Sequence, residues 1–410
     1  MGVAPRGGEV MPVVDVDIVI LGGGLVGLTL ANLLAQTTEY SIALVEQQAP
    51  ELIWDAKQYD LRVSAVARSA RNIFSTLNVW QDIVQQRVGV YRNMLVWDGA
   101  SGAEIAFNAA KFAEPELGHV IENRVMQAAL WRKLQVLQQQ QRVNVIYGKV
   151  QDLLPQENSQ ALVLTEALTD RTINARLIVG ADGANSWLRQ HQRIPITAWE
   201  VNQHALVVTV ETTEPHNNTA RQVFNSDGPL AFLPLDQPQL SSIVWSGAPE
   251  LVNSRMELTA QEFGHQLDQA FGYRLGNSSL FGVRAQFPLK PMHADSYLGH
   301  RTVLVGDAAH VVHPLAGQGL NLGLRDVALL AELLQQHGLS KTSVGLKKTL
   351  RKYERQRRSE NFAMLSSGVG FKSLFAAEDL FTRTIRANGL RLVNKCAWLK
   401  RALALKAMGM

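Results

Sequence analysis

The chain has 410 residues, of which 46% are hydrophobic and 19% charged, and a formal net charge of +4 at pH 7. This length predicts two domains, and the composition is that of a globular protein. A single cysteine, Cys396, excludes an internal disulfide and an all-cysteine metal cage, which favours a reducing cytoplasm. Three consecutive glycines interrupt the apolar stretch 16–35, so we interpret it as strand, turn and helix rather than a membrane span.

A strand, a glycine-rich turn and an apolar helix are predicted at the start of the chain. The β-branched run 13–21 leads into Gly22-Gly23-Gly24-Leu25-Val26-Gly27 and then into the apolar segment 28–35. We expect Gly22 to form the turn, Gly24 to let the backbone approach a pyrophosphate, and Gly27 to let the helix pack on the strand. The free N–H groups of the first helical turn, at Leu25 and Val26, would then bind the anion.

A second strand is predicted at 41–45 and ends at Glu46, nineteen residues after Gly27. An acid at this spacing predicts hydrogen bonds to ribose hydroxyls and disfavours a 2′-phosphate. Two alternatives stay open. The glycine turn could be a packing turn of an unrelated α/β sheet, and Glu46 could merely cap its strand.

Two further glycine signatures follow predicted buried strands much later in the chain. Asp182-Gly183 is one, and Gly306-Asp307 with the loop Gly317-Gln318-Gly319-Leu320-Asn321 is the other. We expect Asp307 to accept from a ribitol or ribose hydroxyl, and the loop to present a helix N-terminus to negative charge on a bound ring. Because the chain has one pyrophosphate fingerprint, the signatures together favour a single extended cofactor.

Between these signatures the pattern becomes rich in strands. β-Branched and aromatic runs at 204–211, 220–224 and 240–246 are bounded by turn residues. They predict an antiparallel sheet inserted into a nucleotide-binding fold, since signatures lie on both sides of it. The predicted division is a nucleotide-binding domain at 13–75, 111–195 and 299–345, a sheet domain at 76–110 and 196–298, and a basic helical region at 346–410.

The C-terminal end of the chain is basic. Residues 341–410 contain sixteen Lys and Arg and four Asp and Glu, a balance of +12, which leaves −8 for the remainder. A basic amphipathic helix suits an anionic membrane surface, and predicts peripheral contact with the inner face of the cytoplasmic membrane. The solvated outer face of an ordinary closing helix is the alternative. We do not expect nucleic acid, because no nucleic-acid motif accompanies the charge.

The order and spacing of the signatures resemble the flavin-dependent aromatic hydroxylases of the para-hydroxybenzoate hydroxylase class. Within that class the chain resembles the ubiquinone-biosynthesis hydroxylases, and most of all the 2-polyprenylphenol hydroxylases. The resemblance implies an α/β fold with a Rossmann-like, GR2-type FAD-binding domain, an inserted antiparallel sheet domain for the substrate, and a C-terminal helical segment. It covers nearly the whole chain and is carried by residues 61–65, 119–123, 178–189, 232–235 and 306–323.

The resemblance also implies roles for individual residues. Arg62 would lie near the flavin diphosphate and Asn123 near the flavin, while Asp182 and Gly183 would contact FAD and the nicotinamide donor. Asp307 would bind the ribityl chain, and the loop from Gly317 to Asn321 would lie under the isoalloxazine ring. Arg62 could instead be an ordinary surface charge, and Asn123 could be the N-cap of the helix that follows it.

The chemistry implied by the resemblance belongs mainly to the cofactor. FAD would be reduced by NADH or NADPH, bound transiently, and O2 would be the cosubstrate. A phenol would attack a flavin C4a-hydroperoxide through a carbon ortho or para to its hydroxyl, in a site that excludes water. The Pro314 carbonyl is expected to contact the substrate, and His313 to accept or relay a proton. No metal is expected at His310 and His313, because both lie in the flavin-loop match.

The implied substrate, a polyprenyl phenol, is almost wholly apolar, so we expect its cavity between the sheet domain and the flavin. A ubiquinone-biosynthesis protein complex is the implied partner. Two other functions stay open, an FAD-dependent reductase of prenyl double bonds and a non-catalytic FAD-containing scaffold. The candidate lining residues, of which we expect fewer than half to touch the substrate, are Trp199, Phe224, Phe232, Leu233, Trp245 and Phe287.

Overall fold

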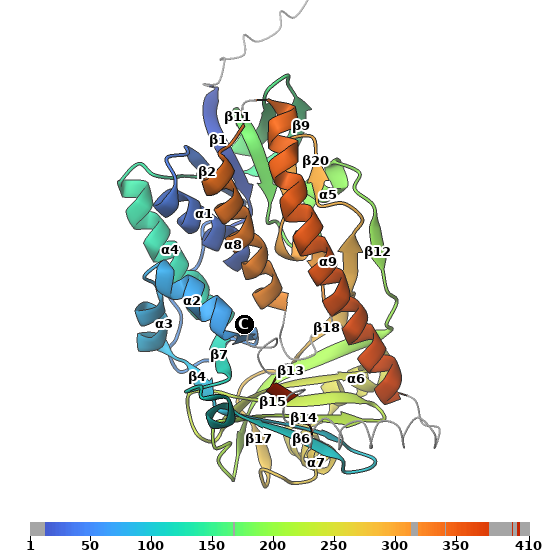
Figure 1. The fold of residues 1–410 in the computed structure, drawn as a ribbon. Helices are drawn as coiled ribbons and strands as arrows, with labels where there is room; N and C mark the ends of the chain where they lie inside the picture. The colour runs from blue at the N-terminus through green and yellow to red at the C-terminus, as the bar shows by residue number, and fades with distance from the viewer. Residues whose placement is uncertain are drawn as a thin grey trace, which may run out of the picture.

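An α/β domain and a domain built on a large sheet lie end to end, and helix α9 (Ser343–Ala376) runs along both (Figure 1). The computed structural model describes residues 13–166, 169–312, 319–340, 342–376, 396, 400 and 401. Within this part of the chain, no helix combines the length and hydrophobicity that crossing a bilayer requires.

Parallel strands form the centre of the α/β domain, in the order β21-β11-β1-β2-β8. Such a sheet is covered on both faces, which explains why its strands are continuous apolar runs. The hairpin of β9 (Lys149–Pro155) and β10 (Gln160–Glu166) extends the sheet from β11, and β20 (Leu298–Gly299) closes its other edge. The central strands are β1 (Val14–Leu21), β2 (Ile42–Glu46), β8 (Asn144–Tyr147), β11 (Thr169–Gly180) and β21 (Thr302–Leu304).

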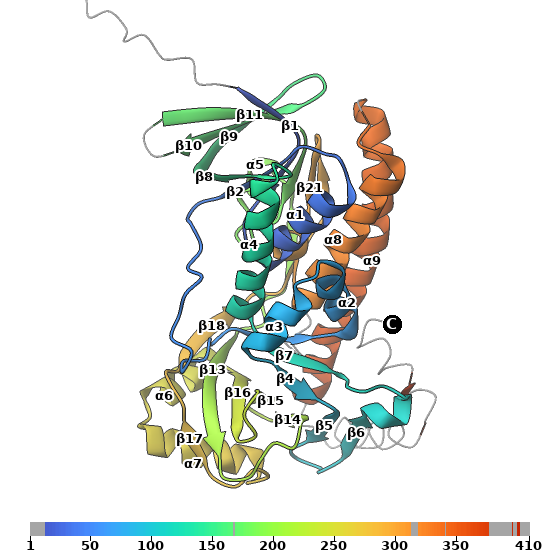
Figure 2. The ribbon, with the colours of Figure 1, turned by 90° about the vertical axis from the view of Figure 1, so that its left-hand side faces the viewer.

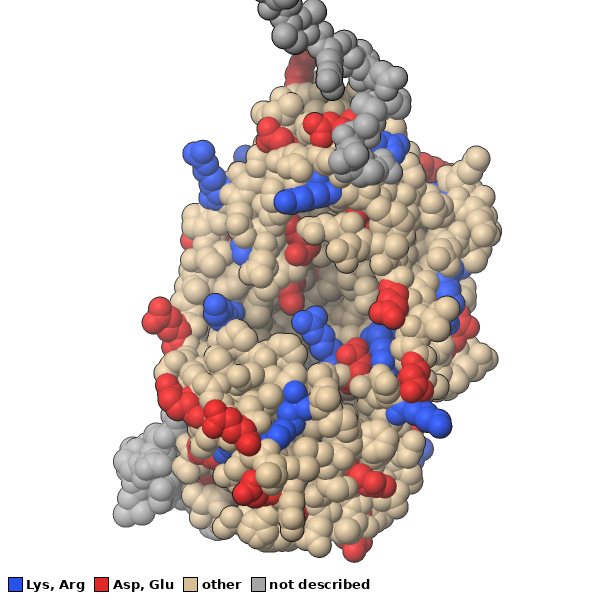
Figure 3. All heavy atoms as spheres, turned by 180° about the vertical axis from the view of Figure 1, so that it is seen from behind, with Lys and Arg blue, Asp and Glu red and all other residues tan. Residues whose placement is uncertain are grey.

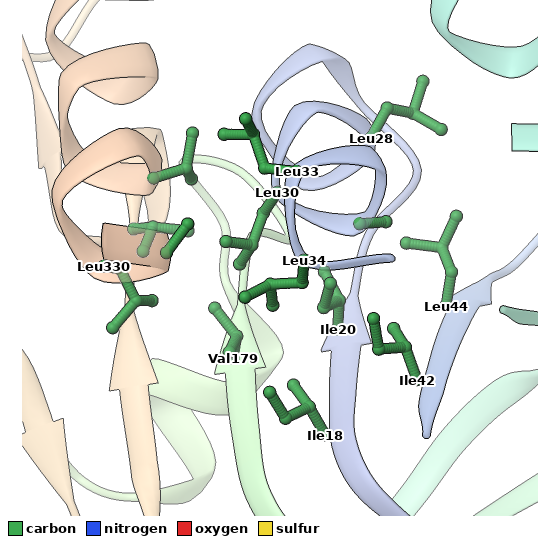
Figure 4. Packing of buried hydrophobic residues seen from close by; sticks show 14 of the residues in the cluster. Ile18, Ile20, Leu28, Leu30, Leu33, Leu34, Ile42, Leu44, Val179 and Leu330 are labelled. Carbon is green, nitrogen blue, oxygen red and sulfur yellow. The ribbon is translucent and has the colours of Figure 1, made fainter. Parts of the chain in front are cut away.

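Helix α1 (Leu25–Thr37) lies between α4 (Asn123–Gln139) and α8 (Gly319–His337) and is buried along most of its length. Its leucines pack over the isoleucines of β1 and β2 and against Leu330 of α8 (Figure 4). A helix surrounded in this way is apolar all round rather than amphipathic. This packing fixes the position of the N-terminus of α1 relative to the sheet.

The large sheet has the order β17-β13-β16-β15-β14-β5-β6, and β18 also pairs with β13. Helices α6 (Pro249–Glu257) and α7 (Ala260–Phe271) cover one of its faces. The predicted antiparallel pairing is confirmed except between β14 and β5, which are parallel. These two strands are more than a hundred residues apart in the chain, so a long connection joins them, as parallel strands require. Its strands are β5 (Asn93–Asp98), β6 (Glu104–Asn108), β13 (Gln203–Thr212), β14 (Thr219–Asn225), β15 (Gly228–Pro234), β16 (Leu240–Gly247), β17 (Ser278–Leu280) and β18 (Ala285–Leu289).

Two small sheets complete the structure, one formed by β3, β7 and β4 and the other by β12, β19 and β22. The predicted domain division stays a prediction. Of segment 76–110, β5 and β6 join the large sheet whereas β4 pairs with β7. The remaining elements are β3 (Val63–Val66), α2 (Arg68–Thr76), α3 (Trp80–Gln86), β4 (Gly89–Tyr91), η1 (Ala109–Phe112), β7 (Gly118–Glu122), α5 (Trp187–His191), β12 (Ile196–Ala198), β19 (Met292–Ala294), η2 (Gly306–Ala308) and β22 (His310–Val311).

A buried histidine in β7 predicts acid lability. His119 packs edge-on against Trp80, and burial, with Arg71 nearby, lowers the pKa of its imidazole to about 4. In the unfolded chain the pKa of this imidazole is near 6.5. Between pH 6.5 and pH 4 the unfolded state therefore binds more protons than the folded state, and stability falls as the pH drops through this range. Between pH 7 and pH 5 we expect the wild type to lose about 2 kcal/mol more unfolding free energy than the His119→Gln variant. Urea unfolding of both proteins at the two pH values measures this difference. His265→Gln, at an exposed position, is the control, and an equal pH dependence in both variants would contradict the assignment.

Candidate cofactor and active site

The first glycine signature forms a tight turn with open space above it. Gly22 has φ +104°, and a Cβ there would lie 2.5 Å from the Ala181 carbonyl oxygen. A Cβ on Gly27 would lie 2.0 Å from the Gly22 carbonyl oxygen, so neither position accepts a side chain. At Gly24, by contrast, a Cβ would meet no described atom within 4 Å, and no side chain caps the helix α1 that begins at Leu25. The first N–H groups of α1 therefore face a space suited to an anion.

The other two signatures pack directly against this turn. Ala181, next to Asp182, touches both Gly22 and Gly27. A Cβ on Gly306 would lie 3.1 Å from Val26 Cγ2, and one on Gly323 of α8 would lie 2.7 Å from the same atom. Stretches nearly 300 residues apart in sequence thus meet around the N-terminus of α1, which is the geometry that a single extended ligand requires.

Glu46 fixes one side of the turn. Its carboxylate accepts the Gly23 N–H at 2.5 Å and also the N–H of Gln47. Gln127 of α4 donates to the Gly23 carbonyl at 3.1 Å, and the buried Trp131 one turn later contacts Gly23. Our sequence reasoning missed these two α4 residues. Their i, i+4 spacing signals only a shared helix face, since the partner loop lies a hundred residues away.

Asp182 has one free carboxylate oxygen. Its Oδ2 accepts the N–H of Leu188 at 3.1 Å, whereas the buried Oδ1 has no hydrogen-bond partner among the described residues. Arg189, whose role sequence reasoning missed, donates to the carbonyls of Ala184 at 2.7 Å and Ala308 at 2.8 Å. This arginine ties the second signature to the turn that carries Asp307, and the free Oδ1 is an acceptor available to a ligand.

Asp307 lies exposed on the wall of the site. Surrounding protein atoms raise the pKa of its carboxyl above the usual range, although Arg62 and His310 oppose the rise. A carboxylate that is both crowded and open to solvent is typical of a concave surface. Figure 3 shows such a hollow between the two domains, with basic and acidic side chains around it.

The segment between β2 and β3 brings Arg62 to the sheet domain (Figure 2). Tyr59 of this segment donates to Asp236 at 2.7 Å, and the guanidinium of Arg87 lies 4.0 Å from the centre of its ring. The guanidinium of Arg62 itself lies 5.7 Å from the ring centre of Phe287 in β18. Arg62 is therefore exposed at the junction of the domains, between Phe287 and the charge of Asp307.

Two asparagines that we predicted as cofactor ligands use their side chains within the protein. The amide of Asn321 donates to the carbonyl of Ala65 at 2.8 Å and accepts the N–H of Ala67 at 2.9 Å. Asn123 accepts from Ser64 Oγ at 2.7 Å. The alternative that Asn123 is an N-cap is wrong, because α4 begins at Asn123 itself and the cap position belongs to Glu122.

The rest of the predicted flavin loop is described in part. His313, Pro314, Gly317 and Gln318 lie outside the described residues. Gly319 and Leu320 form the start of α8, so this helix begins within the predicted loop rather than after it. His310, considered and rejected as a metal ligand, contacts Asp326 Oδ2 at 2.5 Å. Among the described residues no group of three possible ligands could hold a metal.

Asp326 of α8 is a fully buried acid that sequence reasoning missed. Its Oδ2 accepts the Gly306 N–H at 3.0 Å as well as His310, and its Oδ1 accepts from Arg357 at 2.7 Å and Asn361 at 3.1 Å. Burial alone would raise its pKa, but His310 and Arg357 outweigh burial and lower it to about 2. The ionised carboxylate thus holds the turn that carries Asp307.

Five of the six candidate lining residues divide between the two faces of the large sheet, whereas Trp199 lies between β12 and β13 with its ring centre 6.3 Å from that of Phe362 of α9. Phe232 and Trp245 were wrong candidates, because they pack under α6 and α7 in the core of the sheet domain. Strand alternation places Leu233, Phe224 and Phe287 on the opposite face. Leu233 packs there with Val120 of β7, so this face meets the α/β domain.

The residues around the α1 turn fit an FAD-sized dinucleotide. No side chain caps the N-terminus of α1, and the Oδ1 of Asp182 has no hydrogen-bond partner among the described residues, so a bound ligand would supply partners for these polar groups. A side chain added at Gly24 or Gly183 would meet no described atom within 4 Å, which leaves room for such a ligand. The similarity of the chain to known proteins agrees with this fit. A family model described as an FAD binding domain matches residues 121–366.

Known proteins are similar to nearly the whole chain. The 3-demethoxyubiquinol 3-hydroxylase of Escherichia coli (strain K12) is 33% identical, over 96% of this chain and 98% of that protein. Ubiquinone hydroxylase UbiL of Rhodospirillum rubrum is 35% identical, over 96% of this chain and 89% of that protein. Among solved structures, p-nitrophenol 4-monooxygenase PnpA of Pseudomonas putida DLL-E4 has a TM-score of 0.76 at 18% identity, covering 96% of this chain and 98% of that one. The last similarity shows the fold.

Proposed function

Because the chain belongs to the FAD-dependent hydroxylases of ubiquinone biosynthesis, and is therefore a flavin-dependent monooxygenase, we propose that it hydroxylates the ring of a polyprenylated phenol. The position of Arg62 carries the proposal. Its guanidinium lies 5.7 Å from the ring centre of Phe287 on the sheet, and its charge opposes the rise in the pKa of Asp307 at the cofactor turn, so a ring bound on the sheet would lie next to the cofactor.

The surface of the sheet that faces the α/β domain supports a neutral, apolar substrate. Its central positions carry aliphatic or hydroxyl side chains and no ionisable group. An aromatic acid would need a cation among these central positions to offset desolvation of its carboxylate, whereas a prenylated phenol would not. Arg62 lies at the edge of this surface, beside Phe287, where it acts on the charge of Asp307. These positions are Ala205, Val207 and Thr209 of β13, Ala231 and Leu233 of β15, and Ser242, Val244 and Ser246 of β16.

Bound FAD would supply the activation of O2, and the residues of this chain would hold FAD and the phenol. The first N–H groups of α1 would bind the diphosphate, Glu46 the adenosine ribose, and Asp307 the ribityl chain. Asp182 would accept a hydrogen bond through its free Oδ1. The apolar sheet surface would keep water away from the reacting ring and hold the ring in one orientation.

The electron donor, the partners and the location are also proposals. NADH or NADPH fits a site that opens to water at the hollow of Figure 3. A protein complex of ubiquinone biosynthesis and the inner face of the cytoplasmic membrane fit a substrate too apolar to diffuse in water. His313 as a proton relay and the Pro314 carbonyl as a substrate contact remain predictions.

Labelled oxygen tests the reaction. Enzyme loaded with FAD is given NADH or NADPH, 2-octaprenylphenol and oxygen-18-labelled O2, and the product is examined by mass spectrometry. We expect one labelled oxygen atom in a new hydroxyl group on the ring, and no labelled oxygen in the product when the water is labelled instead of O2. A product that gains two hydrogens and no oxygen would overturn the proposal in favour of prenyl reduction.

A second substrate follows from the similarity to the Escherichia coli enzyme, whose name specifies a demethoxyubiquinol. The same assay with a demethoxyubiquinol distinguishes the two ring substrates by their kcat/KM. We expect the polyprenylphenol to be preferred. A preference for the demethoxyubiquinol would mean that the protein is a hydroxylase acting at a different step of the pathway. The ubiquinone precursor that accumulates in cells lacking the protein would identify that step independently.

A further inference from the structure

The outer side of α9 carries a straight row of cations with an apolar residue at each end. The row members are spaced three or four residues apart, so they lie on one side of the helix. All are exposed, the two apolar ends by 81% and 48%. We call this row the α9 stripe, which consists of Val344, Lys348, Arg351, Arg355, Arg358 and Phe362.

The inner side of the helix is fixed, so the α9 stripe cannot turn inward. Leu346, Leu350 and Tyr353 are buried, and Tyr353 donates to the Leu304 carbonyl at 2.9 Å. Arg357, also buried, binds Asp326. Figure 2 shows α9 along the outer edge of the molecule, where its free side meets solvent.

The acids of α9 do not neutralise the stripe. The helix contains two, Glu354 and Glu360. Glu354 accepts from Ser296 Oγ at 2.7 Å and from the Tyr297 N–H at 2.8 Å, on the inner side. Glu360 forms an ion pair with Arg357. The stripe is therefore a continuous positive surface, whereas the opposite face of the molecule shows both signs of charge intermixed (Figure 3).

We propose that the α9 stripe docks the protein on the anionic headgroups of a lipid bilayer. Cations in a row on a helix match a planar anionic surface, and long basic side chains can lie along it while their charges stay hydrated. Val344 at one end would enter the boundary between headgroups and acyl chains, and Phe362 at the other, whose ring packs edge-on against His293, would reach it with its exposed half. An acidic protein would match the charge but gives no reason for exposed apolar ends. Docking through this face leaves the hollow on the opposite face open to water.

Vesicle flotation tests the proposal on the full chain loaded with FAD. We expect the wild-type protein to float with vesicles of phosphatidylcholine and phosphatidylglycerol but not with phosphatidylcholine alone, and to dissociate as salt rises. The variant Lys348→Gln, Arg351→Gln, Arg355→Gln and Arg358→Gln should bind the anionic vesicles about 600-fold more weakly, because each of the four cations near such a surface contributes about fivefold.

A control variant separates docking from net charge. It carries Lys57→Gln, Arg92→Gln, Lys149→Gln and Arg193→Gln, which remove the same charge from exposed positions outside α9. We expect it to float like the wild type, and both variants to keep the wild-type Tm and flavin content. Wild-type protein that ignores anionic vesicles, or a stripe variant that binds as well as the control, would overturn the proposal. Neither result depends on turnover, so hydroxylation is tested separately.

Discussion

An Asp307→Ala variant is expected to fold normally and to purify with little yellow colour. The Asp307 side chain is exposed and lies at the cofactor turn, so its loss removes a ligand contact without opening a cavity in the core. A hydrogen bond to a charged group contributes about 1.5–3 kcal/mol, which corresponds to a weakening of FAD binding by about tenfold to a hundredfold. Titration of apoprotein with FAD, followed by quenching of the flavin fluorescence, gives the Kd, and thermal unfolding of the apoprotein reports the fold.

Two variants make this prediction specific. Asp82→Ala removes an exposed carboxylate from α3 and should leave the flavin content unchanged. Asp307→Asn keeps an acceptor oxygen at the same place and should restore part of the affinity. Full flavin absorbance in Asp307→Ala, with the Kd of the wild type, would show that this carboxylate does not contact the cofactor.

The glycine signatures could be predicted from sequence because their constraints are local. Gly22 needs a positive φ and Gly27 has no room for a side chain, and both follow from a strand that turns directly into a helix. The same locality explains the predictions for Glu46 and Asp307, which stand at strand ends. That these stretches meet at Val26 follows from the order of parallel strands, since the carboxyl ends of such strands share one edge.

The faces of the large sheet could not be predicted in the same way. Phe232 and Leu233 are adjacent in sequence and point in opposite directions, one into the core under α7 and the other toward the α/β domain. Which of the two faces the site depends on the register of the sheet and on where α6 and α7 pack. The parallel pairing of β14 with β5 was hidden for a related reason, because it joins segments more than a hundred residues apart.

The buried polar contacts were hidden because their partners are distant. Arg189 reaches Ala308, and Asp326 binds residues on η2, β22 and α9. An acid within the apolar run of α8 is a signal that some cation must lie nearby, but it does not identify which. For Asn321 the sequence predicted a place near the cofactor, whereas only the structure shows that its amide joins β3 to α8.

An Asp326→Asn variant is expected to lose about 3–5 kcal/mol of unfolding free energy, because it leaves Arg357 as a buried charge without its partner. The amide cannot replace the carboxylate in either orientation. Gly306 and His310 present donors to one oxygen, and Arg357 and Asn361 present donors to the other, so the amide N–H2 always meets a donor. Urea unfolding of the apoprotein measures the loss, and FAD titration shows whether release of the Gly306 turn also weakens cofactor binding.

Tyr353→Phe is the matched control, since it removes a buried hydrogen bond between α9 and β21 without exposing a charge. It should reduce the unfolding free energy by about 1 kcal/mol and leave the FAD affinity unchanged. The double variant Asp326→Asn, Arg357→Met should be more stable than the sum of its single changes by about 1–3 kcal/mol, because the unpaired cation is gone. If the two changes were additive, the ion pair would not be the source of the loss. If FAD bound Asp326→Asn as tightly as the wild type, the carboxylate would stabilise the fold without positioning the Gly306 turn.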